Sequence, residues 1–253
     1  MRLSLPLVLR LALLAVLVDF LVEPGRYRGL LEPLTENGAP AIYNQGDLLA
    51  LTLAHLATVA IAIGAATVVA IGLAVFVTRP IGVTFLALSR SIVNIGQTFP
   101  PVAVLALAVP IVGFGEKPTL IALFLYGLLP IFENTLTGLT QLPPAVVEAA
   151  RGMGMTEGQR LIGIELPLAL PMILEGIRLS TVIGLATATI GSTVAAKGLG
   201  EVIIAGLLSN NLAFTVQGGV IVAVLAVLIY DGLSGLERLA ARRAGRLLAV
   251  ETS

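Results

Sequence analysis

Long apolar runs bounded by polar residues are the feature that most limits how this chain folds. A helix rises about 1.5 Å per residue, so about 20 mostly apolar residues cross the roughly 30 Å hydrocarbon core of a bilayer. Four runs are at least that long: Leu48–Val77, Leu120–Leu139, Leu168–Val194 and Ala213–Leu233. The sequence therefore predicts an all-α polytopic membrane protein in which these runs are transmembrane helices.

The composition supports lipid as the main surroundings of the chain. Only 12% of the residues are charged, whereas soluble domains carry about 25%, and 57% are hydrophobic. This excludes an ordinary soluble enzyme and a disordered protein, because too few polar side chains exist to cover a soluble surface. The net charge of zero provides no basic field for nucleic acid. The chain has no cysteine and one histidine, His55. We therefore expect no metal site built from the usual Cys and His ligands.

A fifth apolar run extends from about Val83 to Val112 and is interrupted by Gln97–Pro101. Proline lacks a backbone N–H and disfavours helix in the residue before it. We therefore predict one kinked span here rather than two short ones.

The first apolar segment is the weakest, because Arg10 divides it and only Leu11–Val18 is uninterrupted. A cleaved signal peptide is the alternative interpretation. Asp19–Pro24 lacks a small-x-small cleavage site, however, so a retained helix is favoured. The total is then about six transmembrane helices, which places both termini on the same side.

The distribution of Lys and Arg indicates which side that is, through the positive-inside rule. With cytoplasmic termini, the inner basic residues are Arg2, Arg10, Arg79, Arg90, Arg151, Arg160, Arg178, Arg238, Arg242, Arg243 and Arg246. The outer ones are then only Arg26, Arg28, Lys117 and Lys197. This imbalance predicts that both termini are cytoplasmic.

These elements divide the chain into three parts. Residues 1–47 hold the N-terminal membrane helix and a short external loop, Glu23–Asp47. Residues 48–236 form the transmembrane domain, and residues 237–253 form a basic cytoplasmic tail. Within the domain, residues 140–167 are the most polar internal stretch on the inner side, and we call them the insert.

The insert has the pattern of two helices separated by glycine. Pro144 suits the first turn of a helix, and Ala145–Arg151 are good helix formers. Gly152 and Gly154 then interrupt the chain, and Thr156 and Gln159 follow at capping-box spacing, which marks a new helix start. We expect this second helix to end before Pro167. An apolar stripe on the first helix predicts that the insert docks on a partner: Val146, Val147, Ala150 and Met153.

Seven residues of the insert match a known pattern. Glu148-Ala149-Ala150 is followed after three residues by Gly154, and after nine more by Ile164-x-Leu166-Pro167. This spacing resembles the EAA loop of permease subunits in ABC importers, and it implies a type I ABC-importer (MetI-like) permease fold. In that family the loop forms a coupling helix, which sits in a cleft of the ATP-hydrolysing subunit. The small Ala149 and Ala150 suit a close approach, and Gly154 permits a sharp reversal.

The resemblance extends from Leu48 to the C-terminus, and it points to one group of permeases within the family. The segments that carry it are Val93–Pro101, Ala122–Ile131, Glu148–Met155 and Ala188–Val194. They are similar to permeases for glycine betaine, choline and related osmoprotectants, with methionine-type permeases as the nearest competitor. The resemblance implies that the protein lies in a bacterial inner membrane, in contact with lipid. It also implies a second permease subunit, identical or paralogous, a pair of ABC ATPases and an extracytoplasmic solute-binding protein.

The sequence contains no Gly-x-x-x-x-Gly-Lys-Ser/Thr phosphate loop. We therefore expect a chain that is not an enzyme and binds no cofactor, with ATP and Mg²⁺ used by the partner ATPase. Quaternary ammonium recognition usually needs an aromatic cage, whereas this chain has no Trp and 5% aromatic residues. Affinity for such a cation is thus expected in the separate binding protein.

Polar residues inside the spans are functional candidates, because they are costly in lipid. Structural roles are favoured for most: an i,i+3 pair of Arg178 with Glu175 near the interface, and a hydrogen bond for His55. Asp19 and Asp231 are expected to reach water at span ends.

A few polar residues are candidates for the solute path. Ser180, Gly184, Thr187 and Gly191 recur at helical spacing, for which close helix packing is favoured and a path-lining role is the alternative. The broken run suggests a cavity, and Glu133 and Asn134 lie inside a span. The path candidates are Asn94, Gln97, Asn134, Ser180 and Thr187.

An ion-coupled secondary transporter is the alternative of another class. Such proteins normally show inverted repeats and carboxylates near the midplane of the membrane. Neither is evident in this sequence, so the importer permease is favoured.

Overall fold

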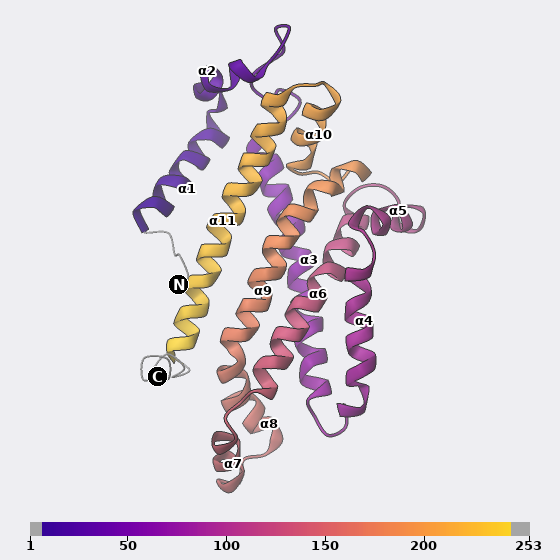
Figure 1. Cartoon of the computed structure of the whole chain (residues 1–253), viewed down its shortest axis with the longest axis vertical. Coiled ribbons are helices and arrows are strands. Elements are labelled where there is room, and N and C mark those ends of the chain that lie inside the picture. The colour runs from indigo at the N-terminus through magenta and orange to yellow at the C-terminus, as the bar shows by residue number, and fades with distance from the viewer. Residues whose placement is uncertain (1–6, 244–253) are drawn as a thin grey trace. The chain divides into compact units, whose positions relative to one another are not determined.

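The computed structural model describes residues 7–243, and every regular element in that range is helical (Figure 1). The all-α prediction is therefore confirmed. The longer helices are α1 (Leu7–Val22), α3 (Leu48–Val77), α4 (Leu86–Thr98), α5 (Pro101–Val112), α6 (Glu116–Thr140), α7 (Pro144–Gly152), α9 (Leu166–Ala188), α10 (Gly200–Leu208) and α11 (Leu212–Arg243). The short ones are η1 (Pro24–Tyr27), α2 (Arg28–Leu31), η2 (Glu32–Leu34), η3 (Val83–Phe85), α8 (Glu157–Arg160), η4 (Leu161–Glu165) and η5 (Thr189–Val194).

Four helices in the described range are long and apolar enough to cross a membrane. They are α3 with 30 residues, α6 with 25, the continuous stretch Glu157–Val194 with 38 and α11 with 32. They match the four predicted runs, and α3 has the predicted ends. The α4–α5 pair provides a fifth candidate if it is one broken span. With α1 as a sixth apolar helix, of which 16 residues are described, the fold agrees with the prediction of about six helices.

The chain breaks more sharply between α4 and α5 than we predicted. The two helices are bent by 96° on either side of Phe99 and Pro100. Pro100 is extended, with φ −60° and ψ 143°, and Pro101 stands in the first turn of α5. Each proline disfavours helix in the residue before it, so the consecutive prolines keep both Phe99 and Pro100 out of a helix. The predicted kink is therefore present as a sharp break between two helices, and the prediction that they form one span stays a prediction.

The described residues group into two compact units. Residues 7–63, 99–124 and 181–231 form unit 1, and residues 64–98, 125–180 and 232–243 form unit 2. The core of unit 1 includes apolar residues of α1, α3, α10 and α11: Leu17, Leu21, Leu48, Leu51, Val202, Ile221 and Leu225. The core of unit 2 joins α3, α6 and α9 through Ile71, Val75, Leu139, Ala169 and Ile173. Each unit is thus held by burial of apolar side chains.

The predicted external loop, Glu23–Asp47, is an ordered part of unit 1, and we call it the outer segment. The Gln217 side chain of α11, 1% exposed, donates to the carbonyl of Ala41 at 2.9 Å and accepts from the amide of Tyr43 at 3.2 Å. The Asn211 amide donates to the carbonyl of Pro40 at 2.9 Å. Polar side chains next to and within α11 therefore hold the backbone of the outer segment.

The predicted basic tail begins as helix. α11 continues to Arg243, and Glu237 within it pairs with Arg178 of α9. Residues 244–253 lie outside the described range, as do residues 1–6 at the other end.

Candidate functional site

The insert forms a helical hairpin at the end of α6 (Figure 1). α7 starts with Pro144 in its first turn, as predicted, and ends at Gly152. Gly154 then has φ +78°, a left-handed backbone that favours glycine. The predicted capping box is present: the Thr156 amide donates to the Gln159 side chain at 2.9 Å, and the Gln159 amide donates to the Thr156 hydroxyl at 3.3 Å.

The second arm of the hairpin differs from the prediction. α8 leads into the π-helical turn η4 and then directly into α9, so no helix end precedes Pro167. In a regular α-helix Pro167 would leave the carbonyl of Gly163 unpaired and clash with it. A wider π turn is a known way for a helix to continue through such a conflict. The predicted helix end before Pro167 was therefore wrong. Pro167 lies in the first turn of α9, where a missing N–H is tolerated, and α9 follows η4 without a break.

The EAA-pattern residues divide between an exposed and a buried side. Glu148, Ala149, Gly154 and Pro167 are exposed, Ile164 and Leu166 are half-buried, and Ala150 is fully buried. In the apolar stripe, Ala150 therefore packs within the chain, whereas Met153 is 72% exposed. A shallow groove of about 880 Å³ runs beside it, lined by Met153, Gly154, Met155, Gly158, Gln159, Ile162 and Gly163. The hairpin thus presents an unfilled surface of apolar and small residues.

An ionic cluster lies behind this surface, and sequence reasoning missed it. The Glu165 carboxylate accepts from Arg160 Nε at 2.6 Å and from Arg79 Nη2 at 2.5 Å. Glu165 and Arg160 are buried, and the Arg79 side chain is 18% exposed. Arg79 lies in the turn after α3, far away in sequence. Arg160 and Glu165 are five residues apart, a spacing that brings side chains together across a π turn but not along a regular α-helix.

Three of the path candidates meet the backbone of α6 near Pro130. Pro130 has no N–H, so it leaves the carbonyl of Tyr126 without its helical donor. The Gln97 side chain donates to that carbonyl at 2.9 Å. Ser180 donates to the carbonyl of Gly127 at 3.0 Å, and Asn134 donates to the carbonyl of Pro130 at 2.8 Å. These three side chains therefore satisfy α6 carbonyls.

The other two path candidates are placed differently. Asn94 is exposed on α4, and Thr187 is half-buried on α9. The glycines beside Thr187 lie in close packing, because an added Cβ at Gly184 would lie 3.4 Å from Ile63 and one at Gly191 would lie 2.5 Å from Thr119. Small residues are needed at such approaches.

The other polar residues that the sequence analysis singled out in the spans are paired. His55 Nε2 lies 3.0 Å from the carbonyl of Leu185, which is the structural hydrogen bond predicted. Glu133 forms a two-point pair with Arg90 at 2.9 and 3.1 Å. Asp19 pairs with Arg26, and Asp231, which is buried rather than at water, pairs with Arg10. No group of acidic and histidine side chains in residues 7–243 has the arrangement of a metal site.

Arg178 keeps its predicted neighbour but not its predicted surroundings. It contacts Glu175 at 3.4 Å, as expected. It is also buried, pairs with Glu237 and donates to Ser234 at 2.9 Å. Arg178 is therefore a buried link between α9 and α11, not a side chain that reaches the interface.

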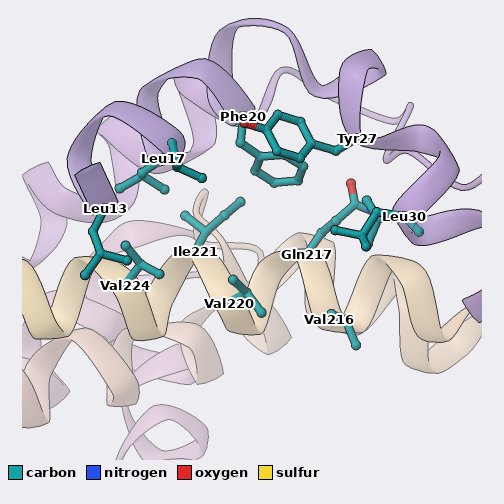
Figure 2. Close-up of a pocket in the computed structure, with 12 residues that line it drawn as sticks. Leu13, Leu17, Phe20, Tyr27, Leu30, Val216, Gln217, Val220, Ile221 and Val224 are labelled. Atoms are coloured by element: carbon teal, nitrogen blue, oxygen red, sulfur yellow. The ribbon is translucent and has the colours of Figure 1, made fainter. Parts of the chain in front are cut away.

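An apolar pocket of about 240 Å³ lies in unit 1 between α1, the outer segment and α11. Figure 2 shows Leu13, Leu17 and Phe20 on one side and Val220, Ile221 and Val224 of α11 on the other. The amide of Gln217 at its edge is already bonded to backbone groups. The pocket therefore offers no free polar group to a polar or charged solute, and it is not the site of one.

The apolar helices of membrane-spanning length are those of a membrane-embedded protein, and the hairpin adds an open surface beside them. The family model described as "Binding-protein-dependent transport system inner membrane component" matches residues 70–236. This chain belongs to that family, so it is an inner-membrane transport permease and not an enzyme.

Individual relatives of the chain are transport permeases too. The chain is 40% identical over 185 residues to the osmoprotectant import permease protein OsmY of Salmonella typhimurium, covering 73% of this chain and 78% of the relative. It is 38% identical over 201 residues to the choline transport system permease protein OpuBB of Bacillus subtilis, covering 77% and 89%. With the glycine betaine/carnitine/choline transport system permease protein OpuCB of B. subtilis the identity is 37% over 211 residues, covering 81% and 90%.

Solved structures support the fold. An inward-facing structure of the MetNI methionine ABC transporter matches with a TM-score of 0.69 at 22% identity, covering 76% of this chain and 95% of that one. An amino acid ABC transporter structure matches with a TM-score of 0.61 at 18% identity, covering 88% and 98%. The expected MetI-like permease fold is thereby confirmed.

Proposed function

We propose that this chain is the permease subunit of an ATP-driven, binding-protein-dependent ABC importer for glycine betaine or a related osmoprotectant. The observation that carries the solute is the identity of 37–40% to permeases named for osmoprotectants, choline, carnitine and glycine betaine. Choline, carnitine and glycine betaine share a trimethylammonium group, which defines the solute class.

The hairpin supports coupling to a separate ATPase. Its exposed groove and the exposed Glu148, Ala149 and Gly154 form a surface on which another subunit can sit. We assign the coupling role to the EAA-pattern residues Glu148, Ala149, Ala150, Gly154, Ile164, Leu166 and Pro167. In this proposal ATP and Mg²⁺ bind the ATPase, and closure of the ATPase pair moves the hairpin.

The assembly that we propose has two permease subunits, two ATPases and one solute-binding protein. Both permease termini are in the cytoplasm, and the outer segment faces the binding protein. For the solute path we propose the residues that the sequence singles out, Asn94, Gln97, Asn134, Ser180 and Thr187; of these, the Asn94 side chain is exposed on α4. Weak, neutral contacts of this kind suit a solute that must be released.

Methionine is the second candidate solute, because a methionine transporter shares the fold. At 22% identity that likeness extends to the fold alone, whereas the permeases named for osmoprotectants are 37–40% identical. The trimethylammonium class is therefore the better supported.

The test is uptake of labelled glycine betaine into proteoliposomes that contain this chain, its ATPase and its binding protein. We expect uptake that needs ATP and is blocked by unlabelled betaine but not by methionine. ATP-driven uptake of methionine would overturn the solute and keep the importer class. Uptake driven by an ion gradient without the ATPase would overturn the class itself.

A further inference from the structure

The ionic cluster of Arg79, Arg160 and Glu165 connects the hairpin to the turn at the end of α3. Glu165 closes the π turn η4, and Arg160 ends α8. Arg79 belongs to a different element, the turn that connects α3 to η3. One carboxylate therefore holds both the hairpin and the end of α3, with N–O distances of 2.6 and 2.5 Å.

The same arm of the hairpin has two opposite faces. Gly158, Gln159 and Ile162 are exposed and line the open groove, whereas Arg160 and Glu165 of the same stretch are buried. A partner that seats in the groove pushes on one face, and the ionic cluster lies on the other. The arm is continuous helix through η4, so it moves as a piece.

The turn that carries Arg79 is tight and well bonded. The Arg79 amide donates to the carbonyl of Phe76 at 3.1 Å, and its own carbonyl accepts from Gly82 at 2.9 Å and Val83 at 3.0 Å. An added Cβ at Gly82 would lie 2.1 Å from the carbonyl oxygen of Phe76. A displacement of the Arg79 side chain should therefore also displace the backbone between α3 and η3.

We propose that Glu165 is a positioning residue that transmits movement of the hairpin to the end of α3, through its paired bonds to Arg160 and Arg79. This inference rests on the proposed importer function. Charge-assisted hydrogen bonds are short and strong, and buried ones are little screened by salt. The π turn is what brings Arg160 within reach of Glu165, so the irregular helix is part of the link.

The test compares Glu165→Gln with wild type in the complete transporter, reconstituted with its ATPase and binding protein. Uptake and ATP hydrolysis are measured on the same vesicles, and the quantity compared is solute moved per ATP hydrolysed. We expect this ratio to fall by about tenfold, the factor that corresponds to loss of one charged hydrogen bond. ATP hydrolysis persists, because the groove that receives the ATPase is unchanged. Glu116→Gln, an exposed carboxylate at the start of α6, is the matched control and keeps the wild-type ratio.

A structural role alone predicts a different result. If Glu165 only stabilised the fold, uptake and ATP hydrolysis would fall together with the amount of assembled transporter, and the ratio would stay at the wild-type value. That outcome overturns the proposal. If Glu165→Gln does not assemble, Arg79→Lys replaces it, since it keeps the charge and shortens the reach; an unchanged ratio in Arg79→Lys likewise overturns the link. A wild-type transporter without ATP-driven uptake would instead refute the proposed function.

Discussion

The outer segment and the insert are both polar stretches between apolar helices, yet the chain holds them by different chemistry. The outer segment is held by neutral amides, with Gln217 bonded to Ala41 and Tyr43. Its buried Tyr43 phenol is also neutral: burial first and the Glu201 carboxylate second raise its pKa further above the usual 10.0. The insert is held by the charged cluster of Glu165 with Arg79 and Arg160.

The difference bears on what each attachment tolerates. A neutral hydrogen bond weakens steeply as its distance and angle depart from the optimum, so amide attachment fixes one geometry. Attraction between charges falls only as the inverse of distance, so an ionic cluster keeps pulling when the groups shift. Amide bonds therefore suit a segment that stays in place, and an ionic cluster suits a hairpin that moves with a partner.

Breaking the reversal of the hairpin should have the largest effect. Gly154 has φ +78°, whereas proline fixes φ near −65°. Gly154→Pro should thus disrupt the hairpin and lower ATP-driven uptake more than tenfold, a factor of ten being about 1.4 kcal/mol. The apolar helices are unchanged, so the chain should still insert in the membrane. Uptake and copurification of the ATPase are the measurements.

Gly38→Pro is the matched control for Gly154→Pro. Gly38 has φ +72° and open space around it, so the backbone conflict is the same, but it lies in the outer segment. We expect the ATPase to copurify with Gly38→Pro and not with Gly154→Pro. Equal copurification with both would mean that the hairpin is not the ATPase contact.

Removing the amide attachment should have a moderate effect, on stability rather than coupling. Gln217→Leu leaves the amide of Tyr43 and the carbonyl of Ala41 unpaired at a site that is 1% exposed. An unpaired buried polar group costs about 1–3 kcal/mol. We expect a lower melting temperature and faster proteolysis within the outer segment, with solute moved per ATP unchanged. Gln45→Leu, an exposed position in the same segment, should be within about 0.5 kcal/mol of wild type; matching melting curves for both variants would contradict the amide attachment.

Local signals in the sequence were sufficient for most of the fold. The ends of α3, the start of α7 and the Thr156–Gln159 capping box all follow from residue types at short range. Hydropathy over about 20 residues is enough for the long helices, because lipid imposes their length.

What could not be predicted depends on pairs that are distant in sequence or on irregular helix. Glu165 and Arg79 are 86 residues apart, and the contact of Glu165 with Arg160 needs a π turn that no helical spacing rule includes. Gln97 stands out in the sequence only as an isolated polar residue, and it also donates to the carbonyl of Tyr126, to which Pro130 cannot donate. Only the pairing of α4 with α6 reveals that role.

The smallest effect should come from the exposed ion pair between the outer segment and α1. Arg26 pairs with Asp19, and their side chains are 63% and 38% exposed; Tyr27 also donates to Asp19 at 3.0 Å, so the carboxylate keeps a partner in Arg26→Gln. Exposed pairs contribute about 0–1 kcal/mol, and we expect a loss within that range by thermal unfolding at low salt. It should vanish near about 1 M salt, where the screening length is about 3 Å. The coupling defect of Glu165→Gln should persist at that salt, because its cluster is buried. A loss well above about 1 kcal/mol at low salt that disappears at high salt would show that charge also anchors the outer segment, and the contrast with the insert would then rest on burial alone.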